Sequence, residues 1–95
     1  MDTLIKRGSL GSDALEELND HQIIVGTKQL KKALNRGGVR RVFLAEDADP
    51  AITGMLELLC QQSGTEYVWV GRMLDLGRAC GIEVGAAAAA TVAKS

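Results

Sequence analysis

Short apolar runs and amphipathic segments alternate along this chain of 95 residues, and this alternation constrains its fold more than any other feature. Apolar runs of strand length lie within residues 21–26, 39–45 and 67–70. Segments with helical spacing of apolar residues lie between them. Alternating strands and helices typically build a sheet that is covered by helices on both faces. The sequence therefore predicts an α/β fold: a three-layer α/β/α sandwich with a small mixed four-stranded sheet.

Two of the predicted helices have strong signals. Residues 27–36 carry an apolar stripe at helical spacing, formed by Leu30, Ala33 and Leu34, and two glycines follow the segment. The second helix is expected after the Asp-Pro pair at 49–50, because Asp is a good N-cap and Pro a good first helical residue. Two further helices are predicted at residues 12–19 and 72–80.

The C-terminal segment GIEVGAAAAATVA supports two interpretations. Its five alanines favour a helix by intrinsic propensity. Its flanks favour extended chain, since they hold the β-branched residues Ile82, Val84, Thr91 and Val92. Small side chains on a strand would also let helices pack closely on the sheet, and we expect a strand. A chain of this length builds one modest core, so residues 1–95 are expected to form a single domain.

The basic residues are concentrated in one segment. Residues 26–41 hold six basic side chains and no acidic one, while the rest of the chain holds five basic and twelve acidic residues. The segment thus has a formal net charge of +6, and the remainder of the chain has a net charge of −7. A local basic segment in an acidic body indicates a compact site for an anionic partner rather than general binding of polyanions.

The helix predicted within this basic segment carries positive charge at its N-terminal end, where it is unfavourable. A helix N-terminus carries partial positive charge, so each cation there costs about 0.3–1 kcal/mol, yet Lys28 lies in the first turn. It starts a row of hydrogen-bond donors with Gln29, Lys32 and Arg36. Such side chains can address base edges, for example guanine O6 and N7, and the first-turn N–H groups at Thr27 and Lys28 can bind an anion. A solvated basic face is the alternative, but a broken local rule is typical of a functional site.

Catalytic and metal-binding signatures are weak. The sequence lacks a nucleophile motif and a glycine-rich phosphate loop, so it does not predict an enzyme or a cofactor. Glu46, Asp47 and Asp49 could bind a metal ion or act as acid and base. However, Asp49 is explained as a helix cap, and the other two are expected to face water or lysines. Two cysteines and one histidine do not predict zinc, so Cys60 and Cys80 are interpreted as small buried apolar side chains.

Three sequence blocks, GTKQLKKAL, VFLAEDADP and LGRACGIEVGAAAAA, occur in this order. They resemble the signature blocks of the L-seven-Ae family of kink-turn RNA-binding ribosomal proteins, and they are most similar to its short bacterial members. The resemblance covers roughly residues 20–93. It implies a non-catalytic protein that binds kink-turns, which are RNA duplexes sharply bent at a three-nucleotide bulge flanked by sheared G·A pairs.

In that family a Gly-x-Asn-Glu-x-x-Lys segment enters the widened major groove at the G·A pairs. The matching residues in this chain are Gly26, Thr27, Lys28, Gln29 and Lys32. Lys28 and Gln29 therefore replace the family's Asn and Glu, as in its bacterial branch. Gln29 can still donate and accept hydrogen bonds, whereas the carboxylate that would accept from guanine is lost. The added charge of Lys28 attracts phosphate.

The family's second contact is the loop before the last strand, which covers a flipped-out nucleotide of the bulge. The resemblance implies residues 81–85 for this loop, with Ile82 and Val84 packing on the unstacked base. Without the resemblance, both would be assigned to the core. It also implies a phosphate contact for Arg78, and a poorly capped helix start at Arg72, where close relatives have Ser.

The predicted RNA-binding residues form two groups: Gly26, Thr27, Lys28, Gln29, Lys32 and Arg36, and then Arg78, Ile82, Glu83 and Val84. The predicted partner is structured RNA that contains a kink-turn, with the ribosome as a further candidate. The sequence does not predict a membrane span or a secretion signal, so we expect a cytoplasmic protein. We also expect a monomer. The alternative function is a ribonucleoprotein scaffold that acts mainly through protein contacts of Met55, Leu56 and Leu58. A third interpretation is an enzyme that acts on a small anion.

Overall fold

The computed structural model describes residues 22–92 of the chain. This part of the chain holds three helices and four strands, which alternate as the sequence predicts. Their bounds are β1 Ile23–Val25, α2 Thr27–Arg36, β2 Val39–Ala45, α3 Pro50–Ser63, β3 Glu66–Val70, α4 Met73–Ala79 and β4 Ala88–Val92. The helix predicted at residues 12–19 lies outside the described residues.

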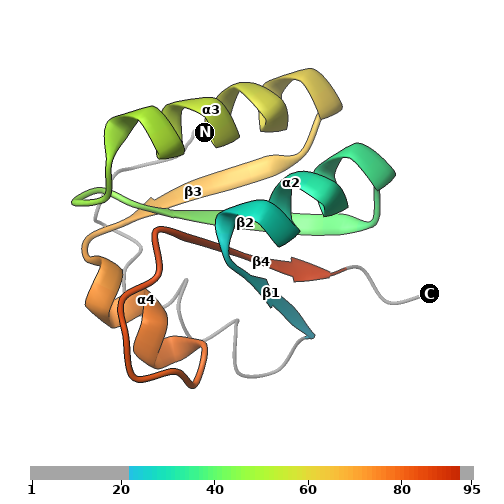
Figure 1. The fold of residues 1–95 in the computed structure, drawn as a ribbon. Coiled ribbons are helices and arrows are strands. Elements are labelled where there is room, and N and C mark those ends of the chain that lie inside the picture. The colour runs from blue at the N-terminus through green and yellow to red at the C-terminus, as the bar shows by residue number, and fades with distance from the viewer. Residues whose placement is uncertain (1–21, 93–95) are drawn as a thin grey trace, which may run out of the picture.

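The four strands form one sheet in the order β1-β4-β2-β3. β2 and β3 are parallel, whereas β4 is antiparallel to both of its neighbours, β1 and β2. Helices α2 and α3 lie side by side on one face of the sheet, and α4 lies on the other face (Figure 1). The predicted three-layer sandwich with a mixed four-stranded sheet is therefore confirmed.

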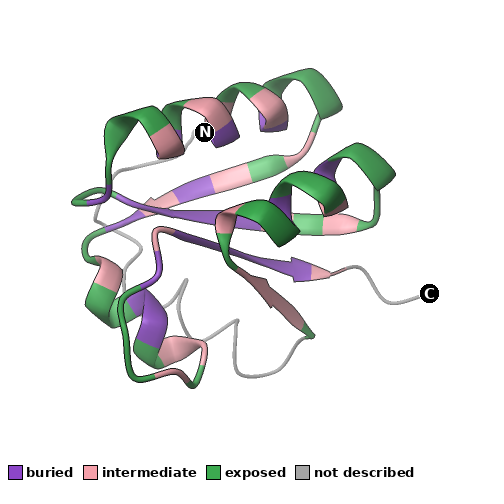
Figure 2. Ribbon diagram, viewed as in Figure 1, coloured by how far each residue is buried: buried purple, intermediate pink, exposed green. Residues whose placement is uncertain are grey.

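The core lies on both faces of the two central strands. Residues Val42 to Ala45 of β2 are buried, and so are Ala88, Ala89 and Ala90 of β4 (Figure 2). Ala88 and Ala90 belong to the cluster formed with α2 and α3, whereas Ala89 belongs to the cluster formed with α4. The strand predicted for the alanine-rich tail is confirmed at its end. Its small side chains let helices of both outer layers approach the strand.

The ends of the helices follow local signals. Asp49 Oδ1 accepts a 2.9 Å hydrogen bond from the backbone N of Ala51, and Pro50 occupies the first turn of α3, as predicted. The bounds of α2 and β2 are the predicted ones. β3 begins one residue earlier than predicted, and α4 is one residue shorter at each end.

Candidate nucleic-acid interface

Two segments implicated by the sequence meet at one edge of the sheet. β1 and β2 end at this edge and β4 begins there, because β4 is antiparallel to both. Gly26 N donates a 3.5 Å hydrogen bond to the Ala88 carbonyl oxygen, and Ala45 N donates a 3.0 Å bond to that of Ala87. The start of α2 is therefore adjacent to the end of the loop that leads into β4 (Figure 1).

Helix α2 begins at a glycine. Gly26 is the N-cap residue, with a φ of 105° in the left-handed region that favours glycine. It offers no side-chain oxygen to the first N–H groups of the helix, and the first turn of α2 has no acidic residue. Neither the N-cap nor the first turn therefore compensates the partial positive charge of this helix start, which suits an anionic ligand.

The outer face of α2 carries the row of polar side chains that the sequence predicts. Leu30 and Leu34 are buried beneath it, and the rest of the predicted apolar stripe, Ala33, is half-buried. The exposed residues are Lys28, Gln29, Lys31, Lys32, Asn35 and Arg36 (Figure 2). Within residues 22–92, the cations of this helix form no ion pair with a carboxylate. Their charge is thus available to a ligand.

The remaining basic residues of the segment lie elsewhere, on β2. Arg41 forms an ion pair with Glu66, with 3.2 Å between the guanidinium nitrogen and the carboxylate oxygen. Arg40 is exposed at the beginning of the strand. Because β2 begins where β4 ends, both arginines are at the edge opposite the start of α2. The basic segment of the sequence therefore divides into two parts in the fold.

The loop of residues 81–85 presents one of its two apolar side chains outward. Ile82 is half-buried and packs against the core cluster beneath α4. Val84 is 67% exposed, and Glu83 beside it is also exposed. The structure thus separates the two residues that the resemblance treats together. Ile82 supports the loop from inside, and Val84 is accessible from outside.

A glycine of α4, which the sequence analysis did not single out, sets the position of this loop. Gly77 is buried, and a Cβ built on it would collide with the backbone carbonyl oxygen of Val84. The same contact region includes a 3.0 Å hydrogen bond from Ile82 N to Gly77 O. At the other end of the loop, a Cβ on Gly85 would lie 3.1 Å from that of Met73. The loop therefore rests directly on the backbone of α4. A glycine in a helix interior is the signal that could have revealed this contact.

The start of α4 is capped from a distant part of the chain. Arg72 occupies the N-cap position, and its side chain makes no capping bond. Instead, Asp47 Oδ1 accepts a 2.8 Å hydrogen bond from Met73 N. Asp47 is exposed to water, as predicted, and its carboxylate also caps α4. Arg72 contributes no cap, in line with the prediction, but the bond from Asp47 means that the helix start is not poorly capped. The cap also joins the loop after β2 to the helix that supports residues 81–85.

Arg78 lies in the last turn of α4 and is exposed. A cation near a helix C-terminus is favourable to the helix dipole. This position gives Arg78 a structural reason to be basic, and its contact with phosphate stays a prediction.

Both cysteines are free thiols. Burial, with a smaller contribution from the charge of Glu57, raises the pKa of Cys60 to about 11, and burial also raises the pKa of Cys80. The thiolate, which is the nucleophilic form, is thus disfavoured at neutral pH. Cys60 is buried as predicted, whereas Cys80 is only half-buried.

In the part of the chain that the structure describes, no three potential metal ligands cluster together. Among those residues, no helix has the length and apolar character of a membrane span.

Comparison with known proteins gives consistent matches. The model of the ribosomal protein L7Ae/L30e/S12e/Gadd45 family matches residues 12–95. An RNA-binding protein of Bacillus pumilus is 53% identical over 68 residues, which cover 72% of this chain and 83% of the relative. An RNA-binding protein of Caldanaerobacter subterraneus is 41% identical over 69 residues, which cover 73% and 84% of the two chains. Among solved structures, the 15.5kD RNA-binding protein of Giardia lamblia superposes with a TM-score of 0.84 at 30% identity, over 96% of this chain and 80% of that one.

Proposed function

Since the chain belongs to the ribosomal protein L7Ae/L30e/S12e/Gadd45 family, we propose that it is an RNA-binding protein whose ligand is a kink-turn. It acts by binding and not by catalysis, as its family and its RNA-binding relatives indicate. The observation that carries the proposal is the exposed cationic start of α2, which lies at the same sheet edge as the loop before β4. The rest of the sequence has a net negative charge, which disfavours binding of RNA in other orientations.

The start of α2 enters the major groove at the G·A pairs. Lys28 and Lys32 are one helical turn apart and exposed, so both reach the same groove. Gln29 is exposed beside Lys28 and supplies an amide that both donates and accepts hydrogen bonds. The first N–H groups of the helix, from Thr27 onward, add a fixed partial positive charge toward phosphate. Arg36, two turns beyond Lys28, extends the phosphate contacts along the helix.

The loop of residues 81–85 contacts the bulge. Val84 is 67% exposed, on a loop that rests on the backbone of α4. An unstacked base that packs on Val84 removes this apolar surface from water, which favours the complex. Glu83 stands beside it, and Arg78 on α4 contacts a nearby phosphate. In this arrangement Ile82 acts from beneath the loop, since it packs against the core.

These two contacts are made together only when the RNA is bent. A ligand shifts an equilibrium toward the state to which it binds more tightly, so the protein stabilises the kinked form of RNA that also samples an extended form. The RNA is ribosomal or regulatory, and the ribosome is one place where the protein would act. Binding as a cytoplasmic monomer is part of the same proposal.

One observation favours a second function. On the outer face of α3, Leu58 is 54% exposed and Met55 is half-buried. Leu56, which was also predicted for this surface, is fully buried and therefore cannot contact a partner. A scaffold that joins a ribonucleoprotein mainly through protein contacts would use this helix. Its affinity would depend little on salt, whereas RNA binding through phosphates weakens steeply as salt rises.

The test is a binding titration against two RNA hairpins. One hairpin carries a kink-turn, and the other has G·C pairs in place of the G·A pairs, so that it cannot kink. The proposal requires strong preference for the first RNA and steep weakening between about 50 and 200 mM salt. Equal affinity for both hairpins would contradict kink-turn recognition, and absence of binding to either would favour the scaffold.

A further inference from the structure

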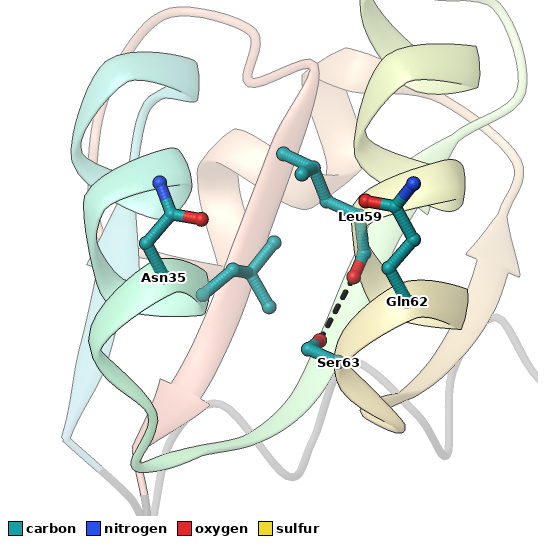
Figure 3. Close-up of a pocket in the computed structure, with 5 residues that line it drawn as sticks. Asn35, Leu59, Gln62 and Ser63 are labelled. Carbon is teal, nitrogen blue, oxygen red and sulfur yellow. Dashed lines mark hydrogen bonds between the residues drawn. The ribbon is translucent and has the colours of Figure 1, made fainter.

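A hollow lies between the C-terminal parts of α2 and α3, away from the start of α2. Its volume is about 220 Å³, and it is lined by Leu34, Asn35, Leu59, Gln62 and Ser63. Figure 3 shows Asn35 on α2 and Gln62 on α3 on opposite sides, with Leu59 between them. Pockets for drug-sized ligands hold roughly 300–1,000 Å³. The hollow is therefore suited to a single ring system and not to a whole nucleotide.

The polar groups of this hollow are two side-chain amides. Within the described part of the chain, neither the Asn35 amide nor the Gln62 amide has a hydrogen-bond partner. The hydroxyl of Ser63 is already used, since it donates to the Leu59 carbonyl oxygen at 2.8 Å. Asn and Gln amides can pair with the edge of a nucleobase through one donor and one acceptor. The leucines supply the apolar surface against which the ring would lie.

The charge around the hollow is suited to a polyanion. Lys31 precedes Asn35 by one helical turn, on the same side of α2, and it has no carboxylate partner within residues 22–92. The nearest acidic side chain along α3, Glu57, accepts a 2.9 Å hydrogen bond from Tyr67 Oη. Asn35 lies seven residues beyond Lys28, or about 10 Å along the helix axis. That distance is about three base steps of a nucleic acid strand at ~3.4 Å each.

We propose that this hollow binds one unstacked nucleobase of the same RNA molecule whose kink-turn lies at the start of α2. This inference rests on the proposed function and adds a second base-binding site to it. Asn35 and Gln62 hold the base edge, Leu34 and Leu59 contact the ring, and Lys31 holds the adjoining phosphate. The ligand is thus a single-stranded extension of the stem that carries the G·A pairs.

The test compares three kink-turn RNAs that differ only at the end of this stem. One is blunt, one has a single-stranded tail of four adenosines, and one has a tail of four abasic sites with the same phosphate charge. The wild-type protein should bind the adenosine tail about fivefold more tightly than the abasic tail, as for one good base contact. The double variant Asn35→Ala/Gln62→Ala should lose this difference and keep its affinity for the blunt RNA. Both residues are exposed, so the fold should persist.

Gln22→Ala is the matched control, because Gln22 is an exposed amide next to β1 and does not line the hollow. This variant should keep the preference for the adenosine tail. Equal affinity of the wild type for the two tails would overturn the inference, since phosphate charge alone would then explain any gain over the blunt RNA. A preference that survives in the double variant would also overturn it. Failure to bind the blunt kink-turn RNA would refute the proposed function itself.

Discussion

Substitution of one buried glycine should displace the loop that carries Val84. In Gly77→Ala, the new methyl group would meet the carbonyl oxygen of Val84, which is a backbone atom and not the end of a flexible side chain. The loop and α4 must therefore separate. The same change at Gly54, in the middle of α3, meets no atom within 4 Å. The two variants thus make the same chemical change in two helices, and only one of them creates a clash.

The expected magnitudes have opposite signs. Replacing Gly by Ala in a helix interior gains about 0.5–1 kcal/mol, so Gly54→Ala should be slightly stabilising. Overpacking a tight contact costs about 1–3 kcal/mol, and the overlap at Gly77 places this site at the upper end. After the helical gain is subtracted, Gly77→Ala should lose about 2 kcal/mol. For a domain of this size, that loss corresponds to a fall in Tm of about 8–16 °C.

Two assays test this reasoning. Thermal unfolding should show a lower Tm for Gly77→Ala and an equal or higher Tm for Gly54→Ala. Titration with kink-turn RNA below both Tm values should show weaker binding only for Gly77→Ala, since only that change moves the loop. If the two variants unfold at the same temperature and bind equally well, the position of the loop does not depend on its contact with α4.

Four further predictions concern single side chains. Lys32→Ala should weaken kink-turn binding about tenfold, whereas Lys6→Ala, which precedes the region matched by the family, should leave the titration unchanged. Val84→Asp should weaken RNA binding without changing Tm, because Val84 is 67% exposed. Asp47→Ala should reduce the free energy of unfolding by about 0.5–2 kcal/mol in urea, through loss of a helix cap. Cys60 has a pKa raised from 9.0 to about 11 by burial, so the stability it contributes is present below pH 9 and is lost as the pH rises toward 11. Cys60→Ala should flatten that part of the pH dependence of unfolding.

The elements that the sequence predicts best are those with local stop signals. Helix α2 and strand β2 have the predicted bounds because two glycines, with φ of 94° and 91°, separate them. Helix α3 begins as predicted because Asp49 caps it by accepting a hydrogen bond from Ala51, only two positions further along the chain. Such signals involve residues that are close in sequence, so they can be recognised without knowledge of the fold.

Two supports of the candidate site depend on contacts between distant residues, and neither was predicted from the sequence. Asp47 caps a helix that begins 26 residues later in the chain. The periodicity of apolar residues predicts the helix but not that these two distant segments come together. Gly77 permits the approach of a loop that returns over its own helix. The row of Lys28, Gln29 and Lys32 was predictable, because its helical spacing places it on one side of a single helix and its positive charge opposes the helix dipole.

We propose that the protein stabilises the bent form of a kink-turn through α2 and the loop before β4. The most direct measurement uses a kink-turn RNA with a fluorescent donor and acceptor on its two stem ends, without added Mg²⁺, titrated with the protein. Energy transfer should rise and saturate with protein, and the Lys32→Ala variant should require about tenfold more protein. Binding that leaves energy transfer unchanged would rule out this mechanism, since the protein would then hold the RNA without selecting its bent form.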